Sequence, residues 1–363
     1  MEVSMGLKKF VSVLLLALFS FSFCAGGVQA ADLVKVPTAW TDREEAFFIW
    51  FAKEKGWDKE EGLNIDIQYY ASGLDMLECL PSGTWVFAGM AGVPAMRGNL
   101  RYGTRIIGIA NDEARSSAVL VRPDSPIAKV KGWNKDYPDV YGSPDTVKGK
   151  TFLTTHNSSA HYALTTWLKI FGLTDEDVTI MDMDQTMALA NFDNKTGDGV
   201  TLWAPYMYTG LEEGWKVASD LQRCNVVYPV WLVADNKYAE AHPDVTAKFL
   251  KIYLRAIKTV QSTAIEKVVP EYQRFFLEWA GKKYSKELCL RDLQMHPVFD
   301  IDQQLALFDE SSGVSKVDKW QEGILEFLNR PGAKHKEMAG ADIDAYATDK
   351  FLRMVKEQQK AGE

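Results

Sequence analysis

The chain has 363 residues, of which 47% are hydrophobic and 25% are charged, and its formal net charge at pH 7 is −8. This composition is typical of a globular protein, and the acidic balance disfavours binding to nucleic acid or to an anionic membrane surface. Because the length exceeds what one hydrophobic core usually covers, we expect two domains.

The N-terminal segment has the pattern of a secretory signal. Two lysines precede an apolar run over residues 10–23, and small residues follow. The run is shorter than the roughly 20 residues that a membrane-spanning helix needs, so we expect residues 1–30 to be cleaved on export to the periplasm. A lipid anchor at Cys24 is disfavoured, because lipidation needs a small residue at the preceding position and Phe23 stands there.

From residue 33 onward, short β-type runs alternate with helix-type runs, which predicts an α/β fold with largely parallel sheets. Helices are expected at 44–56 and 159–171, and the chain becomes strongly helical after the last β-type run. The expected strands are 33–40, 63–70, 84–92, 105–113, 116–125, 149–155, 178–184, 198–205 and 226–236.

Cysteine and histidine spacing argues against a metal centre. The cysteines that follow the signal are Cys79, Cys224 and Cys289, an odd number at wide spacing, which excludes a full disulfide framework but leaves one pair open. His156 and His161 are five residues apart, not on one helical face at i, i+4, and no carboxylate accompanies them at metalloprotease spacing. We therefore expect no metal site, and we also expect no cofactor.

The stretch TFLTTHNSSAHYALTTWLKIFGL joins a β-type run to an amphipathic helix. Asn157 and Ser158 stand where helix N-caps are preferred, so the helix is expected to begin at Ser159. Free backbone N–H groups and the positive end of the helix dipole make such a start a receptor for an oxyanion. The alternative is that Asn157 and Ser158 only cap the helix, while His156 and His161 lie on a solvated loop.

Several segments carry a family resemblance: LVRPDSPI, VKGKTFLTTHNSSAHYALTTWLKIFGL, GVTLWAPYMYTGLEEGWKVASD and VVYPVWLVADNKYAEAHPDVTAKFLKIYLRA. Their best markers are Ser-x-x-His-Tyr at 158–162 and Trp-x-Pro at 203–205. Over about residues 34–264 the chain resembles the solute-binding proteins of ABC importers for nitrate, sulfonates and taurine (the NitT/TauT family). It is most similar to the taurine and alkanesulfonate branch.

The resemblance implies a type II periplasmic-binding-protein fold, in which two α/β lobes close over a ligand. Lobe 1 would comprise residues 31–122 and 235–363, lobe 2 residues 123–234, and the hinge crossings would fall at Val121–Asp124 and Val230–Asp235. A monomeric protein of this kind would deliver a small organic anion to the permease and ATPase subunits of the transporter and would catalyse no reaction.

In open α/β sheets, ligands lie beyond the carboxyl ends of the strands. The anionic head of the solute should therefore rest on the hydroxyls and amides at the start of the 159–171 helix, and its organic part against aromatic side chains. The expected binding residues are Trp40, Ser72, Gly92, Asp112, Glu113, Asn157, Ser158, Ser159, His161, Trp203, Tyr206 and Tyr228.

One departure from the family pattern concerns solute identity. Taurine-specific members tend to carry an acidic residue between the Trp and Pro of the marker, where this chain has Ala204. Asp112, Glu113 or Asp184 could replace it, or the solute could be another sulfonate, a carboxylate or an aromatic anion.

Two other classes of protein compete with a binding protein. The first is an enzyme of thiamine-pyrimidine metabolism with the same fold, which the export signal and the absence of a Gly-rich phosphate loop or GxSxG motif disfavour. The second is a sensory domain, which a transmembrane and signalling segment would normally follow.

Overall fold

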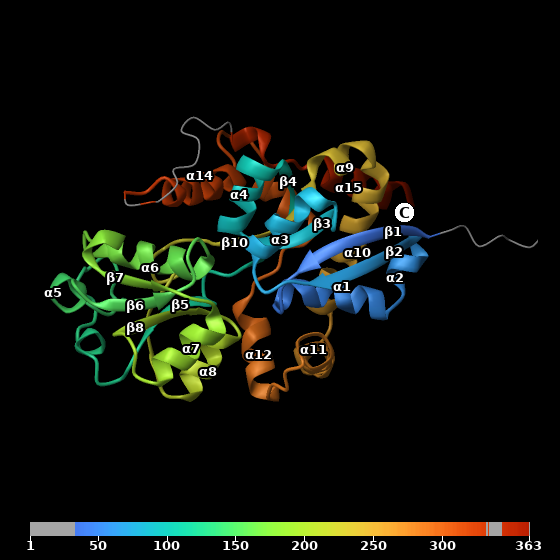
Figure 1. Cartoon of the computed structure of the whole chain (residues 1–363). Coiled ribbons are helices and arrows are strands. Elements are labelled where there is room, and N and C mark those ends of the chain that lie inside the picture. Colours follow the sequence, from blue (N-terminus) through green and yellow to red (C-terminus); the bar gives the residue numbers. More distant parts are fainter. Residues whose placement is uncertain (1–32, 332, 334–342, 363) are drawn as a thin grey trace, which may run out of the picture. The chain divides into compact units, whose positions relative to one another are not determined.

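Two five-stranded sheets organise the protein (Figure 1). The computed structural model describes residues 33–331, 333 and 343–362, so the expected signal at 1–30 lies outside the described residues. The first sheet has the order β2 (Leu63–Tyr69), β1 (Val34–Trp40), β3 (Phe87–Ala91), β10 (Pro229–Asp235), β4 (Thr104–Asp112). The second has the order β7 (Thr179–Asp182), β6 (Thr151–Thr154), β8 (Gly199–Trp203), β5 (Ser117–Val121), β9 (Lys216–Asp220).

Each sheet is parallel apart from one strand. In the first sheet β10 pairs antiparallel with β3 and β4, and in the second β5 pairs antiparallel with β8 and β9. The central strands β3, β5, β8 and β10 are buried along almost their whole length, as expected where both faces of a sheet are covered. The prediction of an α/β fold with largely parallel sheets is confirmed.

The chain passes between the sheets twice. It leaves the first sheet after Asp112 and enters the second at Ser117; it leaves the second after Asp220 and returns at Pro229. Both passages precede the expected crossings at 121–124 and 230–235, because β5 already pairs with strands of the second sheet and β10 pairs with strands of the first. The β-type runs were recognised in the sequence, but which sheet they join depends on partners far away in the chain.

Helices cover both sheets and form most of the C-terminal part (Figure 1). The helices are α1 (Glu44–Glu54), α2 (Trp57–Glu60), α3 (Gly73–Cys79), α4 (Gly92–Tyr102), α5 (Pro144–Val147), α6 (Ser159–Ile170), α7 (Gln185–Asp193), α8 (Tyr206–Glu212), α9 (Asn236–Ala241), α10 (Pro243–Ser262), α11 (Ile265–Ala280), α12 (Lys286–Met295), α13 (Ile301–Phe308), α14 (Lys316–Leu328) and α15 (Lys350–Gly362). None of the helices among the described residues is both long and apolar enough to cross a membrane.

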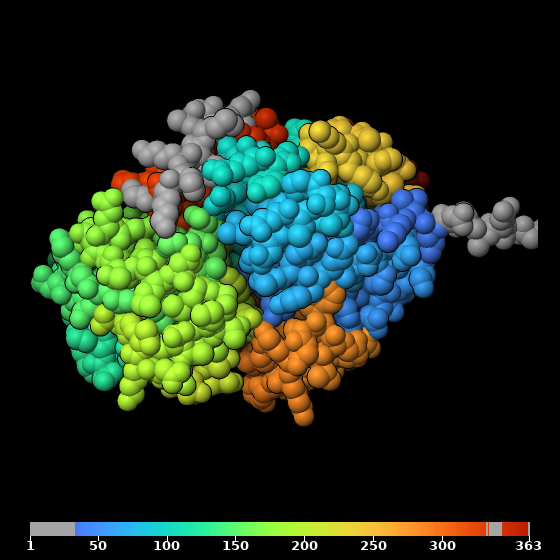
Figure 2. All heavy atoms as spheres, viewed as in Figure 1, coloured from blue at the N-terminus to red at the C-terminus, as the bar shows by residue number. Residues whose placement is uncertain are grey.

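The C-terminal helices contact both the part of the molecule built around the first sheet and the part built around the second. A large buried cluster joins β1, β3, β4 and β10 to α1, α10 and α11, whereas smaller clusters lie around the second sheet. From α8, beside the second sheet, the Tyr208 hydroxyl donates to Asp292 of α12 at 2.7 Å, and Tyr272 of α11 donates to the other oxygen of the same carboxylate. In Figure 2 the orange atoms of α11 and α12 accordingly adjoin both the blue and the yellow-green parts of the chain.

Candidate functional site

A cavity lies where the carboxyl ends of β1, β3, β6 and β8 meet. It encloses about 500 Å³ of empty space, part of it open to solvent. This room suits a small solute. The lining residues are Thr41, Arg43, Glu45, Ser72, Gly73, Leu74, Gly89, Met90, Ala91, Pro94, Thr155, His156, Asn157, Ser158, Ser159 and Trp203.

The start of α6 forms one wall of this cavity. Asn157 has a positive φ of 53°, a conformation that asparagine tolerates better than most residues, and it turns the chain from β6 into the helix. Ser158 is the N-cap: its hydroxyl accepts from His161 N at 3.4 Å and donates to Thr155 O at 2.6 Å. The single hydroxyl proton of Ser158 is therefore engaged within the turn.

Ser159 presents free donors to the cavity. Within the described part of the chain, neither its backbone N–H nor its hydroxyl has a hydrogen-bond partner. The side chain is only 2% exposed, so these donors are largely shielded from solvent. The helix dipole adds a positive potential at this position, so this wall offers donors and positive potential to whatever occupies the cavity.

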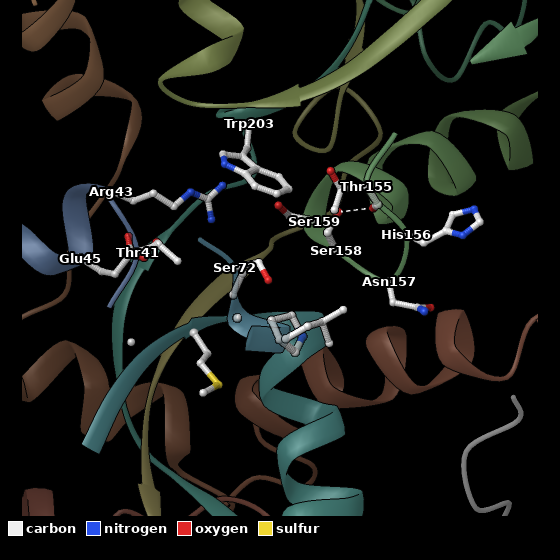
Figure 3. Close-up of a pocket in the computed structure, with 16 residues that line it drawn as sticks. Thr41, Arg43, Glu45, Ser72, Thr155, His156, Asn157, Ser158, Ser159 and Trp203 are labelled. Carbon is white, nitrogen blue, oxygen red and sulfur yellow. Dashed lines mark hydrogen bonds between the residues drawn. The ribbon is translucent and has the colours of Figure 1, made fainter. Parts of the chain in front are cut away.

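Arg43 forms the opposite wall, from the loop between β1 and α1. Its Nη1 lies 2.7 Å from Glu113 Oε1, and its guanidinium carbon lies 5.1 Å from the ring centre of Trp203. Burial lowers the pKa of Arg43, but the carboxylates of Glu113 and Glu45 raise it by more, so the group stays charged. Its Nη2 is buried without a hydrogen-bond partner. Figure 3 shows Arg43 and Ser159 extending toward each other beside Trp203, while His156 and Asn157 point away from Arg43.

Glu45 brings a carboxyl group to the same wall. Its Oε1 accepts from the Thr41 hydroxyl at 2.9 Å, and its Oε2 is buried without a partner. Burial raises the pKa of Glu45 to about 8, although the charge of Arg43 acts in the opposite direction. The cavity therefore contains an unpartnered donor and an unpartnered carboxyl oxygen on neighbouring side chains.

The expected binding residues divide into three groups. Five of them line the cavity: Ser72, Asn157, Ser158, Ser159 and Trp203. Three lie directly behind residues of the wall: Trp40, Glu113 and His161. The remaining four make other contacts: Gly92, Asp112, Tyr206 and Tyr228.

Trp40 is a core residue. Its ring stacks on Tyr253 with centroids 5.9 Å apart, and a Cβ atom added at Gly89 would lie 2.6 Å from it. The side chain thus supports the floor of the cavity from behind Gly89. The expectation that Trp40 encloses the solute does not fit this placement, because the last side chain of β1 faces the helices that cover the first sheet.

His161 also lies behind the wall. Its Nδ1 accepts from Asn157 N at 3.2 Å, so the ring proton resides on Nε2, which lies 2.9 Å from Asp175 Oδ2. Burial lowers the pKa of His161, which favours the neutral ring. The side chain therefore holds the turn in place but does not reach the cavity.

The other displaced residues have structural partners. Tyr228 accepts from Val93 N at 2.9 Å through its hydroxyl, and Asp112 Oδ1 accepts from Tyr228 N at 3.1 Å. The ring of Tyr206 lies 4.4 Å from Lys282 Nζ. Gly92 begins α4 and leaves no room for a side chain, since an added Cβ would lie 2.5 Å from Ile324.

Sequence reasoning missed Arg43 and Glu45. Both lie in the segment DREE that follows β1, but from this part of the chain only Trp40 was expected to bind the solute. The available signal was this run of charged residues at the carboxyl end of a strand, where open sheets bind ligands. No group of three or more His, Cys, Asp or Glu side chains in the described residues could hold a metal ion.

Comparisons with known proteins extend these observations. The chain is 25% identical over 290 residues to a Brachyspira hyodysenteriae protein assigned as an ABC transporter periplasmic binding protein, covering 78% of this chain and 82% of that one. It is 25% identical to the taurine-binding periplasmic protein of Escherichia coli over 53% of this chain and 56% of that protein.

Solved structures share the fold. The alkanesulfonate-binding protein SsuA from Xanthomonas axonopodis pv. citri, bound to MOPS, superposes with a TM-score of 0.65 at 15% identity, covering 88% of this chain and 99% of that one. The predicted two-lobe fold of periplasmic binding proteins and the predicted kinship with solute-binding proteins are confirmed. A family model described as NMT1/THI5 like matches residues 44–263, and the chain therefore belongs to the NMT1/THI5-like family.

Proposed function

We propose that the protein is the substrate-binding component of an ABC transporter and captures a small organic anion, of the sulfonate or taurine type, in the cavity between β1, β3, β6 and β8. It then delivers the solute to the membrane permease and its ATPase subunits, from a periplasmic location. The relatives named as periplasmic binding, taurine-binding and alkanesulfonate-binding proteins support this assignment.

The observation that carries the proposal is the pair of unpartnered donors on opposite walls. Arg43 Nη2 has no acceptor, and neither does the hydroxyl of Ser159 within the described residues. Arg43 Nη2 is buried, and a buried donor without an acceptor destabilises a protein by about 1–3 kcal/mol. An oxyanion placed between the two walls would accept from Arg43 Nη2 and remove this penalty, and it would also accept from the Ser159 hydroxyl. Hydrogen bonds to charged groups contribute about 1.5–3 kcal/mol each, so a few of them hold a small anion at micromolar affinity.

Binding, rather than catalysis, is the activity that the cavity supports. The cavity presents an arginine, a carboxyl group and the positive end of a helix dipole. These groups can recognise the charges of a solute without any chemical reaction. The division into a first lobe, which contains the C-terminal helices, and a second lobe remains part of the proposal, with the sheet-to-sheet passages at 113–116 and 221–228 as the expected hinge.

Calorimetric titration of the chain without residues 1–30, with taurine and ethanesulfonate as probes, tests this function. We expect micromolar binding that Arg43→Gln weakens at least about tenfold, since tenfold corresponds to about 1.4 kcal/mol. Arg353→Gln, which removes an exposed arginine paired with Asp349, is the matched control. Equal affinities of the Arg43 and Arg353 variants would refute the anion site, and recovery of a chemically altered probe would indicate an enzyme.

A further inference from the structure

Glu45 has one carboxyl oxygen that the protein leaves unsatisfied. The residue is 1% exposed and lines the cavity, yet Oε2 has no hydrogen-bond partner. Leaving a buried polar atom unpaired is unfavourable. A partner for this oxygen must therefore come from the content of the cavity.

The position of Glu45 is fixed from behind. Thr41 donates to Oε1 at 2.9 Å, and the Tyr253 hydroxyl of α10 donates to the backbone oxygen of Glu45 at 2.8 Å. On the floor, a Cβ atom added at Gly89 would lie 2.9 Å from Glu45 Cγ. These contacts hold the carboxyl group in one place, with Oε2 as the atom that remains for a ligand.

The other nearby carboxylates are already used. Glu113 pairs with Arg43, Asp112 accepts from two backbone N–H groups, and Asp184 accepts from Met187 N as the cap of α7. None of these three lines the cavity, and among its described lining residues Glu45 is the only acidic one. Glu45, in the first turn of α1, is thus the carboxyl group with an oxygen left for a ligand in this cavity.

We propose that Glu45 is a specificity-determining residue that binds a cationic N–H group of the solute, while Arg43 and Ser159 bind the anionic head of the same molecule. The inference rests on the proposed function and narrows it to zwitterionic solutes. An ammonium group supplies the donor that Oε2 lacks, and it compensates the negative charge that Glu45 would otherwise bring beside an anion. A solute with an anionic head alone leaves Oε2 unsatisfied or requires a protonated carboxyl group.

The protonation state of Glu45 provides an independent readout. The charged groups that act on it are Arg43, which favours ionisation, and Glu113, which opposes it, and the hydroxyl of Thr41 also favours the ionised form. Glu44 and Tyr253 are the other titratable groups nearby. With a pKa of about 8, Glu45 is mostly protonated at pH 7 in the empty cavity. A bound ammonium group favours the ionised form, so its binding releases a proton.

The test compares matched pairs of probes that differ in the ammonium group: taurine with ethanesulfonate, and β-alanine with propionate. At pH 7.5 we expect taurine to bind at least about tenfold more tightly than ethanesulfonate, in line with one charge-assisted hydrogen bond. Glu45→Gln should abolish this preference by weakening the binding of taurine. The affinity for ethanesulfonate should change by no more than about threefold, which is less than the effect of one such bond. Glu60→Gln, at an exposed residue of α2, is the matched control.

If Glu45→Gln does not fold, the role of Glu45 can be tested by measuring how the affinity of the unmodified protein for each probe depends on pH. Between pH 6 and 8 the affinity for taurine should rise, because ionised Glu45 becomes more abundant, and the affinity for ethanesulfonate should fall. Parallel pH profiles of the affinities for taurine and ethanesulfonate would overturn the role of Glu45 but leave the anion-binding function intact. An equal loss of affinity for both probes in Glu45→Gln would have the same meaning. An ammonium preference seen only in the carboxylate pair would support Glu45 and revise the head group, whereas failure of all four probes would reject both proposals.

Discussion

Arg330 and Asp175 form a largely buried ion pair between segments far apart in the chain, with Arg330 Nε 2.7 Å from Asp175 Oδ2. Arg330 follows α14, which packs on α4, and Asp175 precedes β7 of the second sheet. Arg330 Nη2 also lies 3.1 Å from His161 Nε2. The ion pair thus connects the part of the molecule around the first sheet to the part around the second sheet, directly behind the start of α6.

Replacing Asp175 with asparagine should destabilise the fold. Burial would raise the pKa of Asp175, but His161 and Arg330 hold it well below its usual range. A carboxylate with a depressed folded pKa stabilises above its unfolded value of about 3.9 and loses this contribution only as the pH falls through the folded value. We expect a loss of about 3 kcal/mol at pH 7, measured by urea unfolding, with most of it still present at pH 5. Asp139→Asn, at an exposed pair with Lys131, should change stability by less than about 1 kcal/mol.

The two serines at the start of α6 should respond differently to substitution. Ser158→Ala removes the N-cap and should lower the free energy of unfolding by about 1 kcal/mol. Ser159→Ala removes a free donor, so it should leave unfolding nearly unchanged and weaken anion binding about tenfold. Parallel unfolding and calorimetric titrations of both variants test this division; weakening of binding by Ser158→Ala alone would contradict it.

Gly89 should not tolerate even a methyl group. A Cβ atom there would lie 2.6 Å from the ring of Trp40 and 2.9 Å from Glu45, and overpacking of this kind usually costs about 1–3 kcal/mol. We expect Gly89→Ala to lower the melting temperature and to displace the floor of the cavity. Gly323→Ala is the control, because its Cβ would meet only the Tyr162 hydroxyl at 3.5 Å and a helical glycine gains from the exchange. Equal melting temperatures would refute the close approach.

The three cysteines of the described residues are free thiols of unequal accessibility. Cys224 and Cys289 are buried, and burial raises the pKa of each thiol to about 12. Since the thiolate is the reactive form, both should resist a thiol reagent at pH 8 in the folded protein. Cys79 is half-buried and should react first. Titration of the chain without residues 1–30, which lacks Cys24, should count one fast thiol before denaturation and three after it; a native count of three would contradict the burial.

Local patterns in the sequence determined much of the architecture. The alternation of β-type and helix-type runs predicted the strands of both sheets apart from β9, whose short, polar sequence KVASD lies at a sheet edge. The residues TTHNSSAH predicted the start of α6, because capping and the left-handed turn depend on neighbours within a few positions. Ser159 and Trp203 both line the cavity, because Ser159 begins the helix that follows β6 and Trp203 is the last residue of β8.

Only the tertiary structure decided which side chains face the solute. Trp40 ends β1 and Arg43 lies three residues later, just before α1, yet the first faces Tyr253 in the core and the second faces the cavity. That choice depends on which face of β1 the distant helix α10 covers, a contact that no local pattern encodes. The unpartnered atoms of Arg43 and Glu45 are likewise visible only once Glu113 and Thr41 have been placed around them, since a buried group is unsatisfied only relative to all its neighbours in space.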